Sequence, residues 1–194
     1  MTKTNERIVS TYIALLRGIN VGGNNKIYMS ELKAAFEQAD FSEVSTYINS
    51  GNVIFSTDET NEVVIKECCE QLIQKTFALP ISVAIISAKD FHKALANAPE
   101  WWGQDPNSRH DAFVVIHPRT APEICAMVSQ LGDCKLEYEQ AAYHGKIIFW
   151  SAVKETFNYT IWSKVMRNKV VHSSITVRNS NTMRKLAELT KEGV

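Results

Sequence analysis

The strongest constraint on the fold is an order of apolar segments that occurs twice along the chain. The first segment, Thr11–Arg17, is apolar on both faces and is typical of a buried strand. Helical and strand-like spacings then alternate in the order β-α-β-β-α-β, which is the order of a ferredoxin-like unit. The remaining segments are a helix from Met29 with Ser30 as N-cap, strands Val44–Ile48 and Asn52–Ser56, a helix over Ile65–Phe77 and a strand over Ile81–Ile86.

The second occurrence follows a connecting helix over Ala88–Ala98 and a turn-rich stretch. Its segments are strand Ala112–His117, helix Pro122–Leu131, strands Leu136–Tyr143 and Lys146–Ser151, helix Phe157–Asn168, strand Ser174–Val177 and a C-terminal helix from about Asn181. We therefore predict an α+β fold of two ferredoxin-like (βαββαβ) units with antiparallel sheets and extra connecting and C-terminal helices. The first unit spans 11–87, the connection 88–109 and the second unit 110–194. A single larger α+β sheet is the alternative.

Charge and hydropathy narrow the function classes. The 194 residues carry 21 Lys+Arg and 21 Asp+Glu, a formal net charge of zero. This balance argues against binding of nucleic acid or an anionic membrane through the net charge of the chain, although it permits a local basic patch. No apolar run reaches the roughly 18 residues of a membrane span, and the N-terminal segment is too polar for a secretory signal. We expect a cytoplasmic protein with no membrane partner.

Cysteine and histidine spacing argues against a metal centre. The cysteines are Cys68, Cys69, Cys125 and Cys134, and no pair has the C-x-x-C spacing of zinc or redox motifs. The histidines form neither an H-E-x-x-H motif nor an i,i+4 pair. We expect reduced cysteines that act as small apolar residues, and we predict neither a metal site nor a cofactor.

The segment between Arg17 and Lys26 carries the strongest functional signal. It contains three glycines, three asparagines and two cations, and it lies where the first strand leads into the first helix. Glycine permits positive φ and close approach of a ligand to the backbone, and main-chain N–H groups at such a loop favour anions. The pattern matches neither G-x-G-x-x-G nor a P-loop. A demanding turn in which asparagine side chains cap backbone groups is an equally good interpretation.

Topology places a second Asn/Gly-rich turn beside this segment. Strand three of a split βαβ unit pairs with strand one, so the turn Tyr47–Asn52 should lie next to Arg17–Lys26. We predict that Arg17 and Lys26 supply charge, Gly22 and Gly23 backbone access, Asn20, Asn49 and Asn52 orientation, and Ser50 a hydroxyl. Neither loop holds a carboxylate, histidine or cysteine, which favours binding over catalysis.

These residues also carry a family resemblance. Tyr12–Met29 (YIALLRGINVGGNNKIYM) and Thr46–Phe55 (TYINSGNVIF) resemble the domain-of-unknown-function 1697 family of bacterial proteins, and Pro99–Trp102 and Thr176–Asn179 extend the match. The resemblance implies a compact α+β fold and a cytoplasmic protein, but no activity. Through the family pattern RNWNT it adds Arg178 and Asn179 to the candidate ligand-binding residues. Ser180 stands where many members have tryptophan, so this chain lacks any stacking group there.

Two further questions are whether the chain binds RNA and whether Arg178 can contact the loops of the first unit. Strand Asn52–Ser56 lacks the basic and aromatic residues with which RNA-binding ferredoxin-like domains stack bases. Adjacent Trp101 and Trp102 are better interpreted as core or interface packing, and Trp150, Tyr159 and Trp162 as the core of the second unit. Arg178 can reach the first-unit loops only if the second unit docks suitably; otherwise its turn is a capped helix start, with Asn181 or Thr182 as N-cap.

The leading hypothesis is a binding module for a small phosphate- or carboxylate-bearing ligand at the corner of Arg17–Lys26 and Asn49–Asn52. The alternative is an enzyme acting on such a ligand, with Arg178, His117 or His144 recruited from the second unit. An RNA-associated protein is the third and weakest interpretation.

Overall fold

The chain folds around two separate four-stranded antiparallel sheets. The computed structural model describes residues 9–132, 135, 137–165 and 168–191. The strand orders are β2-β3-β1-β4 and β6-β7-β5-β8, so the sequence order β-α-β-β-α-β produces the same sheet twice. The predicted α+β class with two ferredoxin-like sheets is confirmed, and the single larger sheet is wrong. We call β1–β4 with α1 and α2 the first unit, and β5–β8 with α4–α6 the second unit.

The first unit is built on a strand that is buried on both faces. Alternate residues of β1 point to opposite sides, with Tyr12 and Ala14 packed under α1 and α2 and Ile13 and Leu15 packed toward the second unit. This explains the unbroken apolar run in the sequence. The elements of this unit are β1 (Ser10–Leu16), α1 (Met29–Gln38), β2 (Ser42–Tyr47), β3 (Asn52–Thr57), α2 (Glu62–Phe77) and β4 (Val83–Ser87).

The second unit repeats the arrangement, but, in the part of it that the structure describes, three short helices replace the single helix α2 between its third and fourth strands. Its elements are β5 (Ser108–Val115), α4 (Ala121–Ser129), β6 (Glu139–His144), β7 (Ile147–Val153), the 3-10 helix η1 (Lys154–Tyr159), α5 (Ile161–Val165), α6 (Lys169–Ser173) and β8 (Ile175–Asn179). The predicted helix over Phe157–Asn168 is therefore wrong as a single element. Thr160 is extended, at φ −70° and ψ 149°, and separates η1 from α5.

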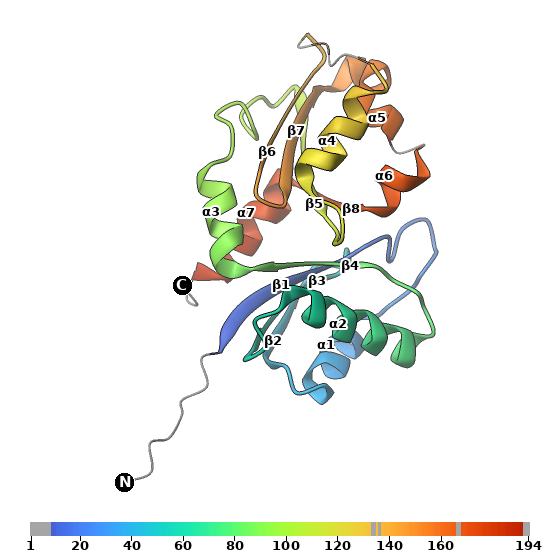
Figure 1. Cartoon of the computed structure of the whole chain (residues 1–194), viewed down its shortest axis with the longest axis vertical. Helices are drawn as coiled ribbons and strands as arrows, with labels where there is room; N and C mark the ends of the chain where they lie inside the picture. Colours follow the sequence, from blue (N-terminus) through green and yellow to red (C-terminus); the bar gives the residue numbers. More distant parts are fainter. Residues whose placement is uncertain (1–8, 133–134, 136, 166–167, 192–194) are drawn as a thin grey trace.

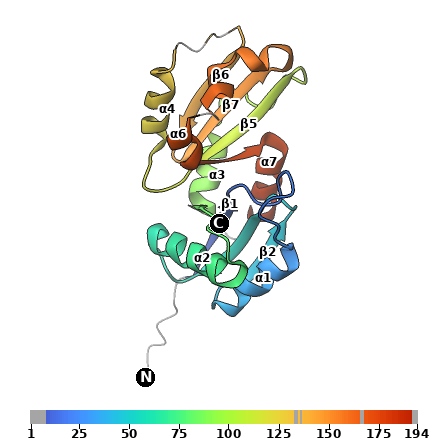
Figure 2. The same ribbon diagram turned by 90° about the vertical axis from the view of Figure 1, so that its right-hand side faces the viewer.

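Two helices outside the repeats lie between the sheets. These are α3 (Ala88–Ala96) and α7 (Ser180–Leu189), which contact each other and sit between the upper and lower sheets in Figure 1. Figure 2 shows the same stacking from the side, with α1 and α2 below and α4 and α6 against the upper sheet. The molecule therefore has three apolar layers, and the middle one is shared by both sheets, α3 and α7.

The middle layer accounts for both adjacent tryptophans, because Trp102 belongs to its buried cluster and the partly buried Trp101 packs against it. Trp102 is 5% exposed, and its ring lies 4.9 Å from that of Phe149 in an edge-to-face arrangement. Its indole N–H donates to the main-chain oxygen of Asp111 at 2.9 Å. The predicted core or interface packing is thus confirmed for Trp101 and Trp102. Trp150 and Trp162 belong to the core of the second unit as predicted, whereas Tyr159 is 69% exposed and does not.

Helix starts and cysteines differ in detail from the sequence predictions. Tyr28, not Ser30, occupies the N-cap of α1 and offers no side-chain hydrogen bond, while Asn179, not Asn181 or Thr182, caps α7. Cys69 is buried, but Cys68 is exposed, so only part of the cysteine prediction holds; Cys134 lies outside the described residues. Over the described part of the chain, no helix has the length and apolar character needed to cross a membrane.

Candidate functional site

The two Asn/Gly-rich loops meet at one end of the first sheet. Leu15 is paired with Asn52 in the register of β1 and β3, and the N–H of Leu16 donates to Gly51 O at 2.8 Å. The Asn20 side chain then bridges the loops by donating to Asn49 O at 2.9 Å. The predicted juxtaposition of Arg17–Lys26 with the turn Tyr47–Asn52 is confirmed.

The glycines of the first loop form its tip. Gly22 and Gly23 have φ of 58° and 80°, and the N–H of Asn24 donates to Val21 O at 3.1 Å. Two consecutive residues of positive φ are the signature of a tight hairpin turn that favours glycine. A Cβ at either glycine would meet no atom within 4 Å. Backbone conformation, not close packing, therefore accounts for these glycines.

The side chain of Asn20 stabilises the loop by hydrogen bonds to backbone groups. Its side-chain oxygen accepts from the N–H of Ile27 at 2.9 Å, and its amide nitrogen donates to Ile27 O at 2.9 Å as well as to Asn49 O. Asn20 has φ 54°, a left-handed conformation that asparagine tolerates better than most residues. These hydrogen bonds match the interpretation in which asparagine side chains cap backbone groups of the turn.

Arg178 links the second unit to this corner. It is 6% exposed, and its Nε donates to the side-chain oxygen of Asn52 at 2.6 Å. Its Nη2 donates to Leu16 O, Ser50 O and Gly51 O at 2.9, 2.7 and 3.0 Å, and its Nη1 donates to Thr176 Oγ1 and Val177 O at 3.0 and 2.8 Å. Burial lowers the pKa of Arg178 to about 10, which leaves it cationic at neutral pH. The second unit thus docks so that Arg178 reaches the first-unit loops.

Asn52 holds Arg178 in place. Asn52 is fully buried, and its amide nitrogen donates to Tyr47 O at 2.8 Å and to Ser50 Oγ at 3.0 Å. With the nitrogen fixed by two acceptors, the amide oxygen faces the guanidinium. Asn52 therefore orients the arginine and is not itself open to a ligand.

Arg17 makes a second link between the units. Its Nε donates to the main-chain oxygen of His172 at 2.9 Å, and its Nη2 donates to His172 Nδ1 at 2.7 Å. Within the described residues, Nη1 of Arg17 has no hydrogen-bond partner. Arg17 is half-buried, and its burial lowers its pKa from the ordinary arginine value.

Most of the predicted site residues line one of two cavities beside the first loop. A cavity of about 520 Å³, which we call the inter-unit pocket, lies between the loop and β8; among the predicted residues it holds Arg17, Ser50 and Arg178. A second cavity of about 300 Å³ at the start of α1, the helix-start pocket, holds Asn20, Gly23, Lys26 and Asn49. Arg17 and Lys26 therefore line different cavities, and Asn24 lines both. Lys26 instead lies 4.9 Å from the ring centroid of Tyr28.

The lining of the inter-unit pocket has a distinct charge pattern. Two arginines and one histidine line it, and none of its lining residues is acidic. Its other lining residues are small, amide or aliphatic: Gly18, Ile19, Val21, Asn24, Asn25, Ser50, Pro80–Ser82 and Ile175–Val177. The pocket thus combines positive charge with an uncharged, partly apolar wall.

The remaining candidates lie elsewhere. Asn179 accepts from the N–H of Thr182 at 2.8 Å as the N-cap of α7. His117 lines a separate cavity of about 330 Å³ beside the inter-unit ion pair of Lys146 with Glu62, and His144 ends β6. Neither histidine lines the inter-unit pocket. Among the described residues, no group of three or more His, Cys, Asp or Glu is placed to hold a metal ion.

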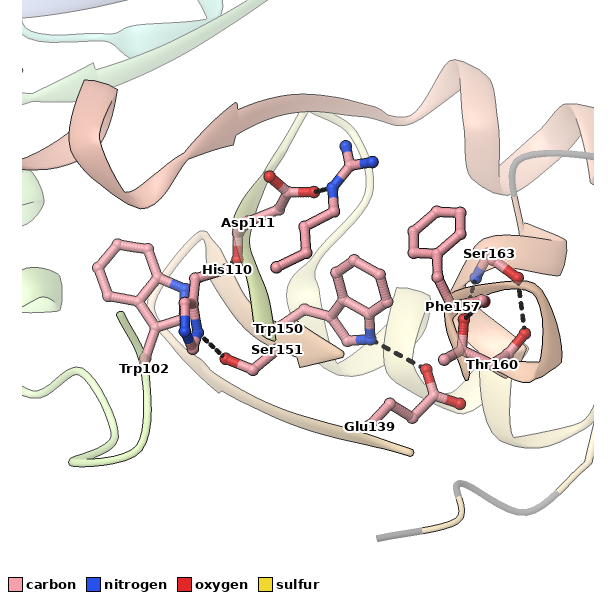
Figure 3. Close-up of polar contacts among 10 residues, drawn as sticks. Trp102, His110, Asp111, Glu139, Trp150, Ser151, Phe157, Thr160 and Ser163 are labelled. Carbon is pink, nitrogen blue, oxygen red and sulfur yellow. Dashed lines mark hydrogen bonds and ion pairs between the residues drawn. The ribbon is translucent and has the colours of Figure 1, made fainter. Parts of the chain in front are cut away.

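Sequence reasoning missed two residues with connecting roles. His172 is one; its only signal was a histidine in a short segment before the last strand. Glu139 is the other: this buried carboxylate accepts from the indole N–H of Trp150 at 2.9 Å and from the N–H groups of Ile161 and Trp162 at 2.5 and 3.2 Å. Figure 3 shows the indole of Trp150 directed at Glu139, and the cross-strand contact of His110 with Ser151 nearby. A glutamate within the predicted strand Leu136–Tyr143 was the available signal for Glu139.

Comparison with known proteins yields no activity. The family model described as "Protein of unknown function (DUF1697)" matches residues 9–149. A conserved bacterial protein from Streptococcus pneumoniae is 28% identical, with a TM-score of 0.82 over 94% of this chain and 99% of that one. An unknown protein from Galdieria sulphuraria is 11% identical over 89% and 98% of the two chains, but its TM-score of 0.27 carries no argument. No curated protein matches the sequence.

Proposed function

The chain belongs to the DUF1697 family, whose function is unknown, and we propose a function from the geometry of this member. We propose that the inter-unit pocket binds a small anionic ligand. The ligand carries a carboxylate or phosphate group that lies beside Arg17. This proposal moves the site from the whole Arg17–Lys26 loop to the side of that loop that faces the second unit.

One observation carries the proposal: two guanidinium groups and no acidic residue line the same pocket. Arg178 is buried among carbonyl oxygens, and none of its hydrogen-bond partners in the described part of the chain is a carboxylate. A buried charge without a counter-ion is costly even when every N–H is satisfied. An anion in the pocket would offset that cost and would be bound more tightly than in an exposed basic patch.

The ligand's contacts follow from the donors that remain open. All five N–H groups of Arg178 are directed at protein oxygens, so it contributes charge and not hydrogen bonds. Arg17 Nη1 and the Ser50 hydroxyl have no acceptor within the described residues and are the groups that would contact the anion. Gly18, at φ 65°, keeps the backbone close to the pocket without a side chain in the way.

Pocket size and sheet burial favour a small molecule over RNA. A volume of about 520 Å³ is within the range of small-molecule sites. RNA-binding domains with this sheet order stack bases on an exposed sheet face. Here both faces of both sheets lie in apolar layers, covered by helices or by the other sheet. The sheet surface needed for base stacking is therefore occupied by protein.

The composition of the lining favours binding over catalysis. Acid–base or nucleophilic chemistry needs a group that gives or takes a proton near the ligand. The lining offers one such group, His172, and no carboxylate or thiol to act with it. No observation favours an enzyme. Free thiols at Cys68, Cys69 and Cys125 support the expected cytoplasmic location.

The proposal is tested by a thermal-shift panel of sulfate, inorganic phosphate, short carboxylates and sugar phosphates. A ligand at 100 times its Kd stabilises the folded chain by about 2.7 kcal/mol, so at least one anion should raise the Tm of the wild type. Arg17→Gln should weaken that anion at least tenfold. Lys26→Gln is the matched control, since it removes a cation from the same loop but from the other cavity; its affinity should stay within about twofold. An equal response of both variants, or no Tm rise with any anion, would refute the proposal.

A further inference from the structure

His172 is held against Arg17 by the fold of a short helix. Asn168 caps α6 by accepting from the N–H groups of Val170 and Val171 at 3.0 and 3.3 Å, which fixes the turn that carries His172. The imidazole is half-buried at the pocket wall, and both its ring and its main-chain oxygen accept from Arg17. His172 of the second unit thus orients the guanidinium of Arg17, which belongs to the first unit.

The contact defines the protonation state of the ring. A guanidinium can only donate, so His172 Nδ1, 2.7 Å from Arg17 Nη2, must accept. Nε2 of the same ring lies 3.4 Å from Arg17 Nη2, and a cation this close to both ring nitrogens favours the neutral imidazole. Burial and then the charge of Arg17 lower the pKa of His172 from its ordinary value of 6.5.

The surroundings of His172 contain several charged groups, but one dominates. The elements packed around it carry Arg17 after β1, Arg178 on β8, Lys169 on α6 and Glu123 on α4. Glu123 is engaged in the capping box of α4 with Thr120. Of these charges, that of Arg17 lowers the pKa of His172, in addition to the larger effect of burial.

We infer that His172 sets how much negative charge the inter-unit pocket accepts, because an oxyanion bound beside Arg17 is bound together with a proton on His172. This inference rests on the proposed function. Protonated His172 cannot accept from Arg17, and the two cations repel each other. An oxyanion between them accepts a hydrogen bond from each and relieves that repulsion. By thermodynamic linkage, the anion then favours the proton and the proton favours the anion to the same extent.

Sulfate is the probe for this coupling, since its charge does not change between pH 5.5 and 7.5. Sulfate affinity of the wild type, measured by calorimetry at constant ionic strength, should rise as the pH falls, by at most about tenfold per pH unit for uptake of one proton. His172→Asn keeps an acceptor for Arg17 in Oδ1 but cannot titrate, so its affinity should be independent of pH. His92→Gln removes a histidine on α3, outside the pocket, and should retain the wild-type dependence.

The titration of His172 gives a readout that is independent of affinity. In NMR spectra, its pKa in the free protein should lie below 6.5 and should rise when sulfate is added. Sulfate binding that is equally pH-dependent in His172→Asn, or a pKa of His172 that sulfate leaves unchanged, would overturn this inference while leaving the proposed function intact. Absence of sulfate binding to the wild type at every pH would overturn this inference, whereas the proposed function is refuted only if no anion of the thermal-shift panel binds.

Discussion

Arg178 joins parts of the chain more than 120 residues apart. It donates to the carbonyls of Leu16, Ser50 and Gly51 and to the side chain of Asn52, all in the first unit. Replacing it by Met would leave these buried acceptors without donors. We predict that Arg178→Met lowers the free energy of unfolding by roughly 3 kcal/mol, measured by urea denaturation.

Arg178→Lys tests whether the positive charge alone is sufficient, or whether the hydrogen-bond geometry of the guanidinium is needed. Lysine keeps the cation but cannot reach the same set of acceptors with a single ammonium. Its loss of stability should be smaller than that of Met but still above about 1 kcal/mol. If both variants unfold within about 0.5 kcal/mol of the wild type, the scatter of ordinary surface substitutions, Arg178 does not connect the units as described.

His172 also makes stability depend on pH. Its pKa is lower in the folded chain than in the unfolded chain, so the unfolded chain binds the proton first as the pH falls. The free energy of unfolding should therefore be unaffected by this group above about pH 6.5 and should decline as the pH falls from there through the folded pKa. The measurement is urea unfolding from pH 7.5 to 5. His172→Asn should reduce the decline, and an unchanged slope would contradict this assignment.

At the scale of elements, the turn between β2 and β3 contains a strained residue. Ile48 has φ 47° and is 47% exposed, although β-branched residues avoid positive φ. We predict that Ile48→Asn stabilises the chain by about 0.5–1 kcal/mol, because asparagine tolerates this conformation. Thermal unfolding checks the prediction, and a lower Tm would contradict it.

Gly51 in the same turn provides the contrast. A Cβ there would lie 2.7 Å from Ile19 Cδ1 and 2.8 Å from Leu16 Cβ, and the residue has φ 75°. Gly51→Ala should therefore destabilise the chain by about 2 kcal/mol through overpacking and backbone strain. The two substitutions should shift the Tm in opposite directions.

The elements that sequence reasoning predicted well are those determined by local pattern. The apolar run of β1, the hairpin around Gly51 and the order of the strands all follow from residues close together in the chain. The region after β7 was not predictable in this way. Its single predicted helix is divided at Thr160 because the carboxylate of Glu139, on β6, accepts the first N–H groups of α5. That interaction spans more than 20 residues and leaves no periodic signal.

On the scale of the whole molecule, the shared middle layer makes the two units interdependent. Ile13 and Leu15 of the first sheet and Phe149 of the second lie in one buried cluster with α3 and α7. Separating the units would expose all of these side chains to water. The division of the chain into 11–87, 88–109 and 110–194 is therefore a description of topology, and we propose that neither unit is stable alone.

This interdependence predicts one cooperative unfolding transition. All four tryptophans lie outside the first unit, so their fluorescence reports on the stretch after α3, the middle layer and the second unit. Far-UV circular dichroism reports on both units. The two urea transitions should coincide. Two separate transitions, with fluorescence unchanged while part of the ellipticity is lost, would contradict the shared layer.

The division of the site also arises at this scale. Sequence alone predicted that the loops meet, because strand pairing is a property of the unit's topology. Sequence alone could not predict that Arg17 and Lys26 line different cavities, or that Arg17 contacts His172. Both features depend on how the second unit docks against the first. Docking is determined by the fit of many side chains in the middle layer, which no short motif encodes.

We expect the inter-unit pocket, and not the helix-start pocket, to bind the anion. An NMR titration of the ¹⁵N-labelled chain with inorganic phosphate at pH 7 distinguishes the two pockets. Saturable shifts are expected at the amides of Gly18, Ser50 and Ser82 in the wild type and in Lys26→Gln, and these shifts should be lost in Arg17→Gln. Shifts centred on Lys26 and Tyr28, or no saturable shift in the wild type, would contradict it.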